Sequence, residues 1–373
     1  MKIGLGLYRY MLTRDYYDFA RQAGCTHVVV HLVDYFKEGS SNPRDNQPTG
    51  SKYQPWGMAG DPEKLWTFKE LKQLRREIED AGLVLAAIEN LDPAYWHDIL
   101  LDGPQRSVQI ERVKTIIRRM GEASIPVLGY NFSLAGVCGR VTVAEGRGHA
   151  LVVGMNGPCD EVPVPKGTIW NMVYDRNAPE GNQPSISHDE LWKRLARFLD
   201  EVIPVAEQAG VRLAAHPDDP PMPTMRQQPR LVYQPWMYQR LIDLAPSPSN
   251  ALELCVGTLA EMTDGGVYEA IDSYSRQQRI AYVHLRNVRG KVPHYRETFI
   301  DEGDVDMIRI LAILHRNHFD GVVIPDHSPQ MTCAAPWHAG MAHTIGFILA
   351  VKAMIESPQS YTAELEPFAR GDK

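Results

Sequence analysis

Short apolar runs alternate along the chain with longer stretches in which apolar and charged residues recur at helical spacing. In the first part of the chain the apolar runs cover residues 2–8, 26–31, 83–89 and 125–130. Their shortness predicts buried strands rather than helices, because helices in globular proteins are usually longer. The amphipathic or charged stretches that predict the intervening helices cover residues 14–23, 62–81 and 106–123.

The same alternation resumes with a predicted helix at residues 188–209. Apolar runs that predict four further strands follow at 211–216, 251–255, 280–284 and 322–326. The matching helical stretches cover 234–244, 266–274, 304–317 and 341–355. Eight strands alternating with eight helices predict an α/β fold, a (β/α)8 TIM barrel formed by residues 1–373 as one domain.

Two segments do not fit the alternation. Residues 133–187 are rich in glycine and proline and carry scattered short apolar runs. They predict an insertion after the fourth strand that caps the site. Residues 37–62 are polar and contain serine, asparagine and proline, which predicts a long loop over the active-site face.

Four residues with metal-binding side chains end the last four predicted strands. These residues are His216, Cys255, His284 and Asp326. They are spaced by roughly the 30 or more residues that a strand, a helix and their connections need, so they are expected at the C-terminal ends of successive barrel strands, where active sites lie. A single histidine or cysteine in this place is usually a core residue, but four equivalent ones predict a divalent-metal site.

Residues beside these strand ends are further candidates for chemistry. His327 is predicted to act as a general acid or base, with a fifth ligand or a supporting residue as the alternative. Arg286 is predicted to bind a substrate carboxylate, with a surface salt bridge as the alternative, and Asn287 is expected to assist it. Tyr130 and Asn131 follow the fourth strand and are predicted to line the pocket.

Two aspartates follow the first of the four metal-binding candidates. Asp218 and Asp219 either accept hydrogen bonds from the histidine ligands or cap a turn.

Composition narrows the classes of function. The net charge of −7, without a lysine or arginine run, argues against a nucleic-acid partner. The five cysteines are scattered and contain no CxxC pair, which favours a reducing cytoplasm over a disulfide framework. The N-terminal residues enter a strand at once and show no signal-peptide pattern. The longest apolar stretch, around residues 345–351, is too short for a membrane span.

Several motifs together resemble the mannonate dehydratase family. They are His-Pro-Asp-Asp-Pro-Pro at 216–221, Cys255 with Gly257, His-Leu-Arg-Asn at 284–287, Phe-Ile-Asp-Glu-Gly-Asp-Val-Asp-Met at 299–307 and Pro-Asp-His at 325–327. Glu-Asn at 89–90 and Tyr-Asn-Phe at 130–132 are also similar to that family's segments. The resemblance covers nearly the whole chain.

This resemblance implies a xylose-isomerase-like barrel that dehydrates D-mannonate to 2-keto-3-deoxy-D-gluconate. It implies Mn²⁺, or in some members Fe²⁺, bound by His216, Cys255, His284 and Asp326. It also implies that His327 is one of two groups that move protons.

One segment departs from the family pattern. The family has a tyrosine and, a few residues on, an arginine before the last helix, and the tyrosine is its proposed catalytic partner. In an ungapped alignment His338 replaces the tyrosine and His343 replaces the arginine. Because imidazole also transfers protons, His338 is predicted to be the second catalytic group.

Two alternatives to the dehydratase stay open from sequence. One is a sugar isomerase or epimerase on the same barrel, which usually requires more carboxylate ligands. The other is a catalytically silent member that binds a sugar acid. In each case the expected partner is a small sugar acid or sugar, without nucleic acid or membrane, and the chain is expected to form a homo-oligomer.

Overall fold

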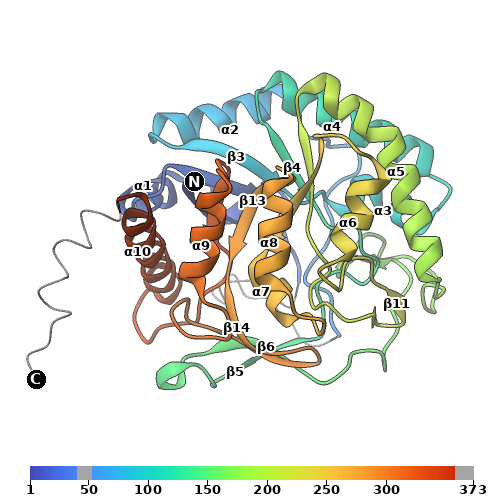
Figure 1. Cartoon of the computed structure of the whole chain (residues 1–373). Coiled ribbons are helices and arrows are strands. Elements are labelled where there is room, and N and C mark those ends of the chain that lie inside the picture. Colours follow the sequence, from blue (N-terminus) through green and yellow to red (C-terminus); the bar gives the residue numbers. More distant parts are fainter. Residues whose placement is uncertain (40–52, 358–373) are drawn as a thin grey trace, which may run out of the picture.

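The computed structural model describes residues 1–39 and 53–357 and confirms the predicted barrel (Figure 1). Eight parallel strands close in the order β1-β16-β13-β12-β9-β4-β3-β2. Their bounds are β1 (Lys2–Leu7), β2 (His27–His31), β3 (Val84–Glu89), β4 (Val127–Tyr130), β9 (Arg212–Ala215), β12 (Asn250–Cys255), β13 (Ile280–Leu285) and β16 (Val322–Pro325). All eight predicted strands are therefore present.

An outer layer of helices surrounds these strands. The predicted helices are α1 (Arg14–Gln22), α2 (Phe68–Asp80), α4 (Arg106–Glu122), α5 (His188–Ala209), α6 (Met237–Leu244), α8 (Val267–Arg276), α9 (Met307–Arg316) and α10 (Pro336–Glu356). Side chains fix several of their starts. Thr67 and Glu70 form a capping box at α2, and Ser187 and Asp306 accept hydrogen bonds from the first backbone N–H groups of α5 and α9.

Two short helices were not predicted, and α10 begins earlier than predicted. The helices α3 (Pro93–Leu101) and α7 (Val256–Glu261) are buried on most or all sides, so neither shows the one-sided apolar pattern by which a surface helix is recognised. In addition, α10 begins at Pro336, five residues before its predicted start, with the proline at the first helical position. Among the described residues there are also short 3-10 turns at η1 (Arg9–Met11) and η3 (Arg147–His149).

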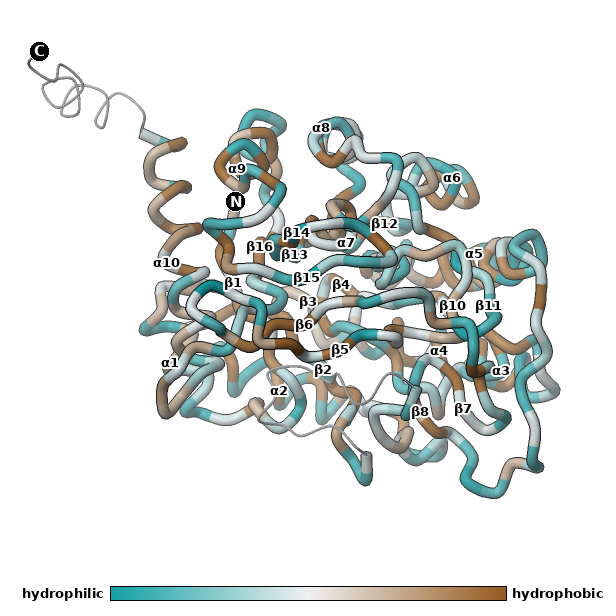
Figure 2. The backbone as a smooth tube through the Cα atoms, turned by 90° about the horizontal axis from the view of Figure 1, so that it is seen from below, coloured by the Kyte–Doolittle hydropathy of each residue, from teal (hydrophilic) through white to brown (hydrophobic). Residues whose placement is uncertain are grey.

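An antiparallel sheet lies across one end of the barrel (Figures 1 and 2). It has the order β14-β15-β6-β5. The strands β5 (Arg140–Val143) and β6 (Val152–Asn156) belong to the predicted insertion, and the hairpin of β14 (Asn287–Lys291) and β15 (His294–Thr298) follows barrel strand β13. The hairpin was not predicted, because its mainly polar sequence lacks a continuous apolar run.

Two smaller pairs of strands lie in the connecting segments. The pair β7 (Thr168–Ile169) and β8 (Met172–Val173) belongs to the insertion, whereas β10 (Thr224–Met225) and β11 (Gln228–Pro229) follow β9. Of the predicted loop at 37–62, residues 40–52 lie outside the described part of the chain. Its far end is described and brings Trp56 to the wall of the central pocket.

Helix α10 is long and apolar enough, by length and composition, to cross a membrane. The prediction of no such stretch was wrong on this point, because it considered only the core of the helix. In the structure α10 contacts β1, β16 and α9 and forms the last helix of the barrel layer. Its buried residues, among them Met341, Ile345 and Ile348, form the face that packs on these neighbours.

Gly129 of β4 leaves room inside the barrel for two buried polar side chains. A Cβ atom at this position would meet the Tyr282 hydroxyl and lie 2.7 Å from Glu253 Oε2. We therefore expect Gly129→Ala to lower the free energy of unfolding by about 1–3 kcal/mol, as overpacked cores do. Urea denaturation measures this change.

Gly346→Ala is the matched control for that substitution. Gly346 lies within α10, and nothing lies within 4 Å of a Cβ built there. Alanine should stabilise this helix by about 0.5–1 kcal/mol. Equal stability of the Gly129 variant and the wild type would contradict the packing described for β4.

Candidate metal centre and active-site pocket

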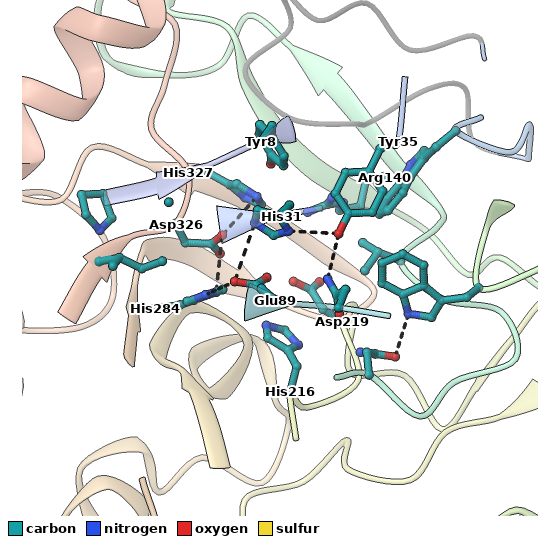
Figure 3. Close-up of a pocket in the computed structure, with 18 of the residues that line it drawn as sticks. Tyr8, His31, Tyr35, Glu89, Arg140, His216, Asp219, His284, Asp326 and His327 are labelled. Carbon is teal, nitrogen blue, oxygen red and sulfur yellow. Dashed lines mark hydrogen bonds and ion pairs between the residues drawn. The ribbon is translucent and has the colours of Figure 1, made fainter. Parts of the chain in front are cut away.

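The four residues predicted to bind metal come together at the C-terminal end of the barrel, and Figure 3 shows three of them, His216, His284 and Asp326. His216, Cys255 and His284 each place one ligand atom within 4.8 Å of the others. Asp326 completes the group, with Oδ1 3.5 Å from His284 Nδ1 and Oδ2 3.8 Å from Cys255 Sγ. They come from β9, β12, β13 and β16, which are successive neighbours in the barrel.

The charge of the Cys255 side chain suits a metal ion. Burial alone would raise the pKa of the Cys255 thiol, but Arg286 and hydrogen bonds from His216 and His284 lower it to about 5. The sulfur also accepts a hydrogen bond from the backbone N–H of Thr258 at 3.4 Å. Cys255 is therefore a thiolate at neutral pH, and the thiolate is the form that binds metals.

His284 supplies a second observation that fits a metal. Its Nε2 lies 3.2 Å from Glu89 Oε2 and 3.1 Å from Glu253 Oε1, whereas Nδ1 lies 3.5 Å from Asp326 Oδ1. Because the two glutamates engage Nε2, Nδ1 is the ring nitrogen that faces Asp326 and the Cys255 thiolate and that could bind a metal. The mixed set of nitrogen, sulfur and oxygen donors suits a transition metal.

Glu89 and Glu253 are residues of the site that sequence reasoning did not assign. Burial and the neighbouring Glu89 raise the pKa of Glu253 to about 8. Together with His284 the two carboxylates form a second group that could hold a cation. Their hydrogen-bonding distance to Nε2 lets them orient the imidazole, as carboxylates beside metal-bound histidines commonly do. The sequence did contain a sign of this role, because Glu253 is an acidic residue inside the apolar run 251–255.

A pocket opens directly above the predicted ligands. His216, His284, Asp326 and His327 line it from one side. The N-terminal strands supply Tyr8, His31 and Glu89, and the insertion supplies Val137, Arg140 and Trp170.

A hydrogen-bond chain fixes the orientation of His31 in this pocket. Asn90 Nδ2 donates to the Tyr35 hydroxyl at 3.0 Å, and that hydroxyl lies 3.0 Å from His31 Nδ1. Since the Asn90 amide can only donate here, the Tyr35 proton goes to Nδ1. His31 therefore carries its own proton on Nε2, which faces Glu89 at 3.7 Å.

His327 lines the pocket immediately after the ligand candidate Asp326. Its Nδ1 lies 2.9 Å from Glu297 Oε1, and its Nε2 lies 3.2 Å from Asp326 Oδ1. Burial alone would raise the pKa of Glu297, but His327 and Arg286 lower it, so Glu297 is a carboxylate. Glu297 can thus accept a hydrogen bond from Nδ1 of His327, and Nε2 is the ring nitrogen on the side of Asp326.

The structure brings only part of the predicted substrate-binding set to the pocket. Asn131 lines it, accepting a hydrogen bond from Trp170 Nε1 at 3.2 Å. Tyr130 packs instead against Trp96 and Phe198.

The neighbouring pair Arg286 and Asn287 is engaged within the protein. Asn287 Nδ2 donates to the backbone oxygens of two residues in the segment after β15. The Arg286 guanidinium is fully buried and contacts four carboxylates, with distances of 2.7 Å to Glu261, 3.0 Å to Asp219, 3.1 Å to Asp326 and 3.2 Å to Glu297. Asp218 has the turn-capping role, because its Oδ2 accepts from the N–H groups of Leu231 and Val232.

His338 lies outside the pocket. It belongs to the first turn of α10, where its ring contacts Tyr16 at 5.4 Å and Phe19 at 4.6 Å between centroids. His343 likewise faces Asp301, at 3.2 Å. This geometry does not favour the catalytic assignment of His338, because helix α10 starts early enough to turn that side chain toward α1.

Comparisons with known proteins find similarity to one family. A model of the D-mannonate dehydratase (UxuA) family matches residues 21–142 and 180–357. The chain is 30% identical over 283 residues to a mannonate dehydratase of Streptococcus pneumoniae, covering 72% of this chain and 76% of that relative. It is 31% identical over 286 residues to that of Lactococcus lactis, covering 71% and 79%.

Solved structures show the same fold. The crystal structure of mannonate dehydratase from Streptococcus suis superimposes with a TM-score of 0.69 at 23% identity, covering 94% of this chain and 93% of that one. An L-ribulose 3-epimerase superimposes with a TM-score of 0.53 at 15% identity, covering 99% of each chain.

Proposed function

The chain belongs to the mannonate dehydratase family of metal-dependent hydro-lyases, and we propose that it removes water from D-mannonate to give 2-keto-3-deoxy-D-gluconate. The observation that carries the proposal is the meeting of His216, Cys255, His284 and Asp326 beneath a pocket that His327 lines. Family membership supports the reaction class, and the relatives' names supply the substrate.

We propose Mn²⁺ as the metal, with Fe²⁺ as the second candidate, held by those four residues. A thiolate, two imidazoles and a carboxylate would suit either ion, and also zinc, so the donor set supports the site more strongly than the element. When bound, a divalent cation supplies Lewis-acid stabilisation of the negative charge that builds up as a sugar acid loses its C2 proton.

The chain's own residues supply the proton transfers. Dehydration breaks the C2–H bond and the C3–O bond, so one group takes a proton and another delivers one to the departing hydroxyl. We propose that His327 Nε2 carries out one of these two proton transfers, because Glu297 fixes the other ring nitrogen, Nδ1, as a hydrogen-bond donor. Among the described pocket residues, His31 also presents a protonated Nε2.

The remaining assignments follow from this function. We propose that residues 133–187 cap the site, because Val137, Arg140 and Trp170 line the pocket. A cytoplasmic location fits cysteines that form no disulfide in the described part of the chain. Self-association into a homo-oligomer remains a prediction.

Turnover of D-mannonate after removal and return of metal tests the function. We expect chelator-treated protein to lose activity by at least about a hundredfold, and Mn²⁺ to restore it. Appearance of the 2-keto-3-deoxy acid measures the reaction, and D-gluconate and D-altronate serve as epimeric controls at C2 and C3. Turnover of a control acid with none of D-mannonate would contradict the substrate assignment.

A further inference from the structure

A sugar acid brings a negative charge into a pocket that is already rich in acids. Glu89, Asp219 and Asp326 all line it. Removing a carboxylate from water is costly unless a cation or hydrogen-bond donors receive it. Arg286, which was predicted from the sequence to bind the substrate carboxylate, is fully buried and contacts four carboxylates of the protein.

Arg140 is a second buried arginine, and its guanidinium forms one long ion pair where that of Arg286 forms four. Only 4% of the residue is exposed, yet it lines the pocket. Its Nη1 makes no hydrogen bond. The distance from Nη1 to Oε1 of the paired acid, Glu297, is 3.8 Å. Hydrogen bonds from charged groups are normally shorter than 3 Å, so this contact leaves Arg140 able to bind another anion.

The position of Arg140 suits a residue that contacts one end of a bound substrate. It is the first residue of β5, in the predicted insertion, and so approaches from the capping sheet rather than from a barrel strand. Figure 3 shows Arg140 and His216 on different sides of the drawn pocket. A ligand between the capping sheet and the metal-binding group would therefore lie within reach of both.

We propose that Arg140 binds the carboxylate of the sugar acid and selects acids over neutral sugars. The inference rests on the proposed function for the identity of the substrate. It gives the insertion a second task besides covering the pocket, because the capping sheet carries the cation that recognises the substrate. Arg286 then serves to hold the acidic residues around the metal-binding group in place.

The test compares D-mannonate with D-mannitol, its counterpart without the carboxylate. Binding to metal-stripped protein is followed by tryptophan fluorescence, since Trp56, Trp170 and Trp337 line the pocket. Arg140→Gln should raise the Kd for D-mannonate about tenfold to a hundredfold and leave that for D-mannitol within about twofold. Arg140→Lys, which keeps the charge but loses the planar fork, should give an intermediate loss.

Arg147→Gln is the matched control on the same insertion. Arg147 is half exposed and pairs with Asp301 at 2.8 Å, away from the pocket, so its variant should bind both ligands as the wild type does. An unchanged Kd for D-mannonate in Arg140→Gln, an equal loss for both ligands, or no binding of D-mannonate by the wild type would overturn the inference.

The failure of the proposed function gives a different pattern. A wild type that binds D-mannonate through Arg140 but never converts it would refute the dehydratase and leave the carboxylate site intact. Conversion of D-mannonate by Arg140→Gln with an unchanged KM would refute the carboxylate site and leave the dehydratase intact.

Discussion

Replacing Cys255 by alanine is expected to abolish metal binding and turnover together. The thiol of Cys255 has its pKa lowered to about 5 beside Arg286, His216 and His284, so the wild type presents a thiolate that alanine cannot replace. Replacing a residue that only orients a metal ligand already lowers metal affinity or activity by about 10–100-fold. We therefore expect at least a hundredfold loss of both, measured by metal analysis after dialysis and by the dehydration assay.

Cys333→Ala is the control for this substitution. Cys333 is exposed and free, whereas Cys255 is fully buried in the site. The Cys333 variant should keep its metal and its activity. A Cys255→Ala protein with full metal content and full turnover would refute the metal assignment.

Replacing His327 by asparagine is expected to separate catalysis from metal binding. Asparagine can still donate a hydrogen bond to Glu297, which His327 contacts at 2.9 Å, but it cannot accept or deliver a proton at neutral pH. We expect kcat to fall by about 10²–10⁴-fold, the usual contribution of a positioned acid or base, with bound metal unchanged.

His338→Asn provides the comparison on the next segment of the chain. The His338 ring packs on Tyr16 and Phe19, outside the pocket. That variant should retain most of the wild-type kcat. Loss of metal from His327→Asn would make His327 a ligand or a support, and an equal loss of kcat from His338→Asn would return it to the catalytic pair.

The barrel could be predicted because each strand is a short apolar run that stops at a polar residue. His216, Cys255, His284 and Asp326 were identifiable for the same reason, since parallel strands present their C-terminal ends at one face. The family resemblance then supplied the reaction and the metal, which spacing alone does not determine.

The remaining parts of the site depend on contacts that sequence spacing does not show. Glu253 lies inside an apolar strand. Its carboxylate fits beside His284 because Gly129 on β4 leaves space for it. Arg286 could be placed on the correct face, but its four acidic neighbours come from separate elements. The position of His338 depends on where α10 begins, and helix ends are the least predictable part of an element.

The central claim is that this chain dehydrates a sugar acid, and proton NMR of the reaction in D₂O tests it most directly. Metal-loaded protein with D-mannonate should give the 2-keto-3-deoxy acid carrying one deuterium at C3, because the enol left after loss of water takes its new proton from the solvent. Accumulation of D-gluconate that carries deuterium at C2 and keeps its C3 hydroxyl, without the keto acid, would instead show epimerisation and contradict the account.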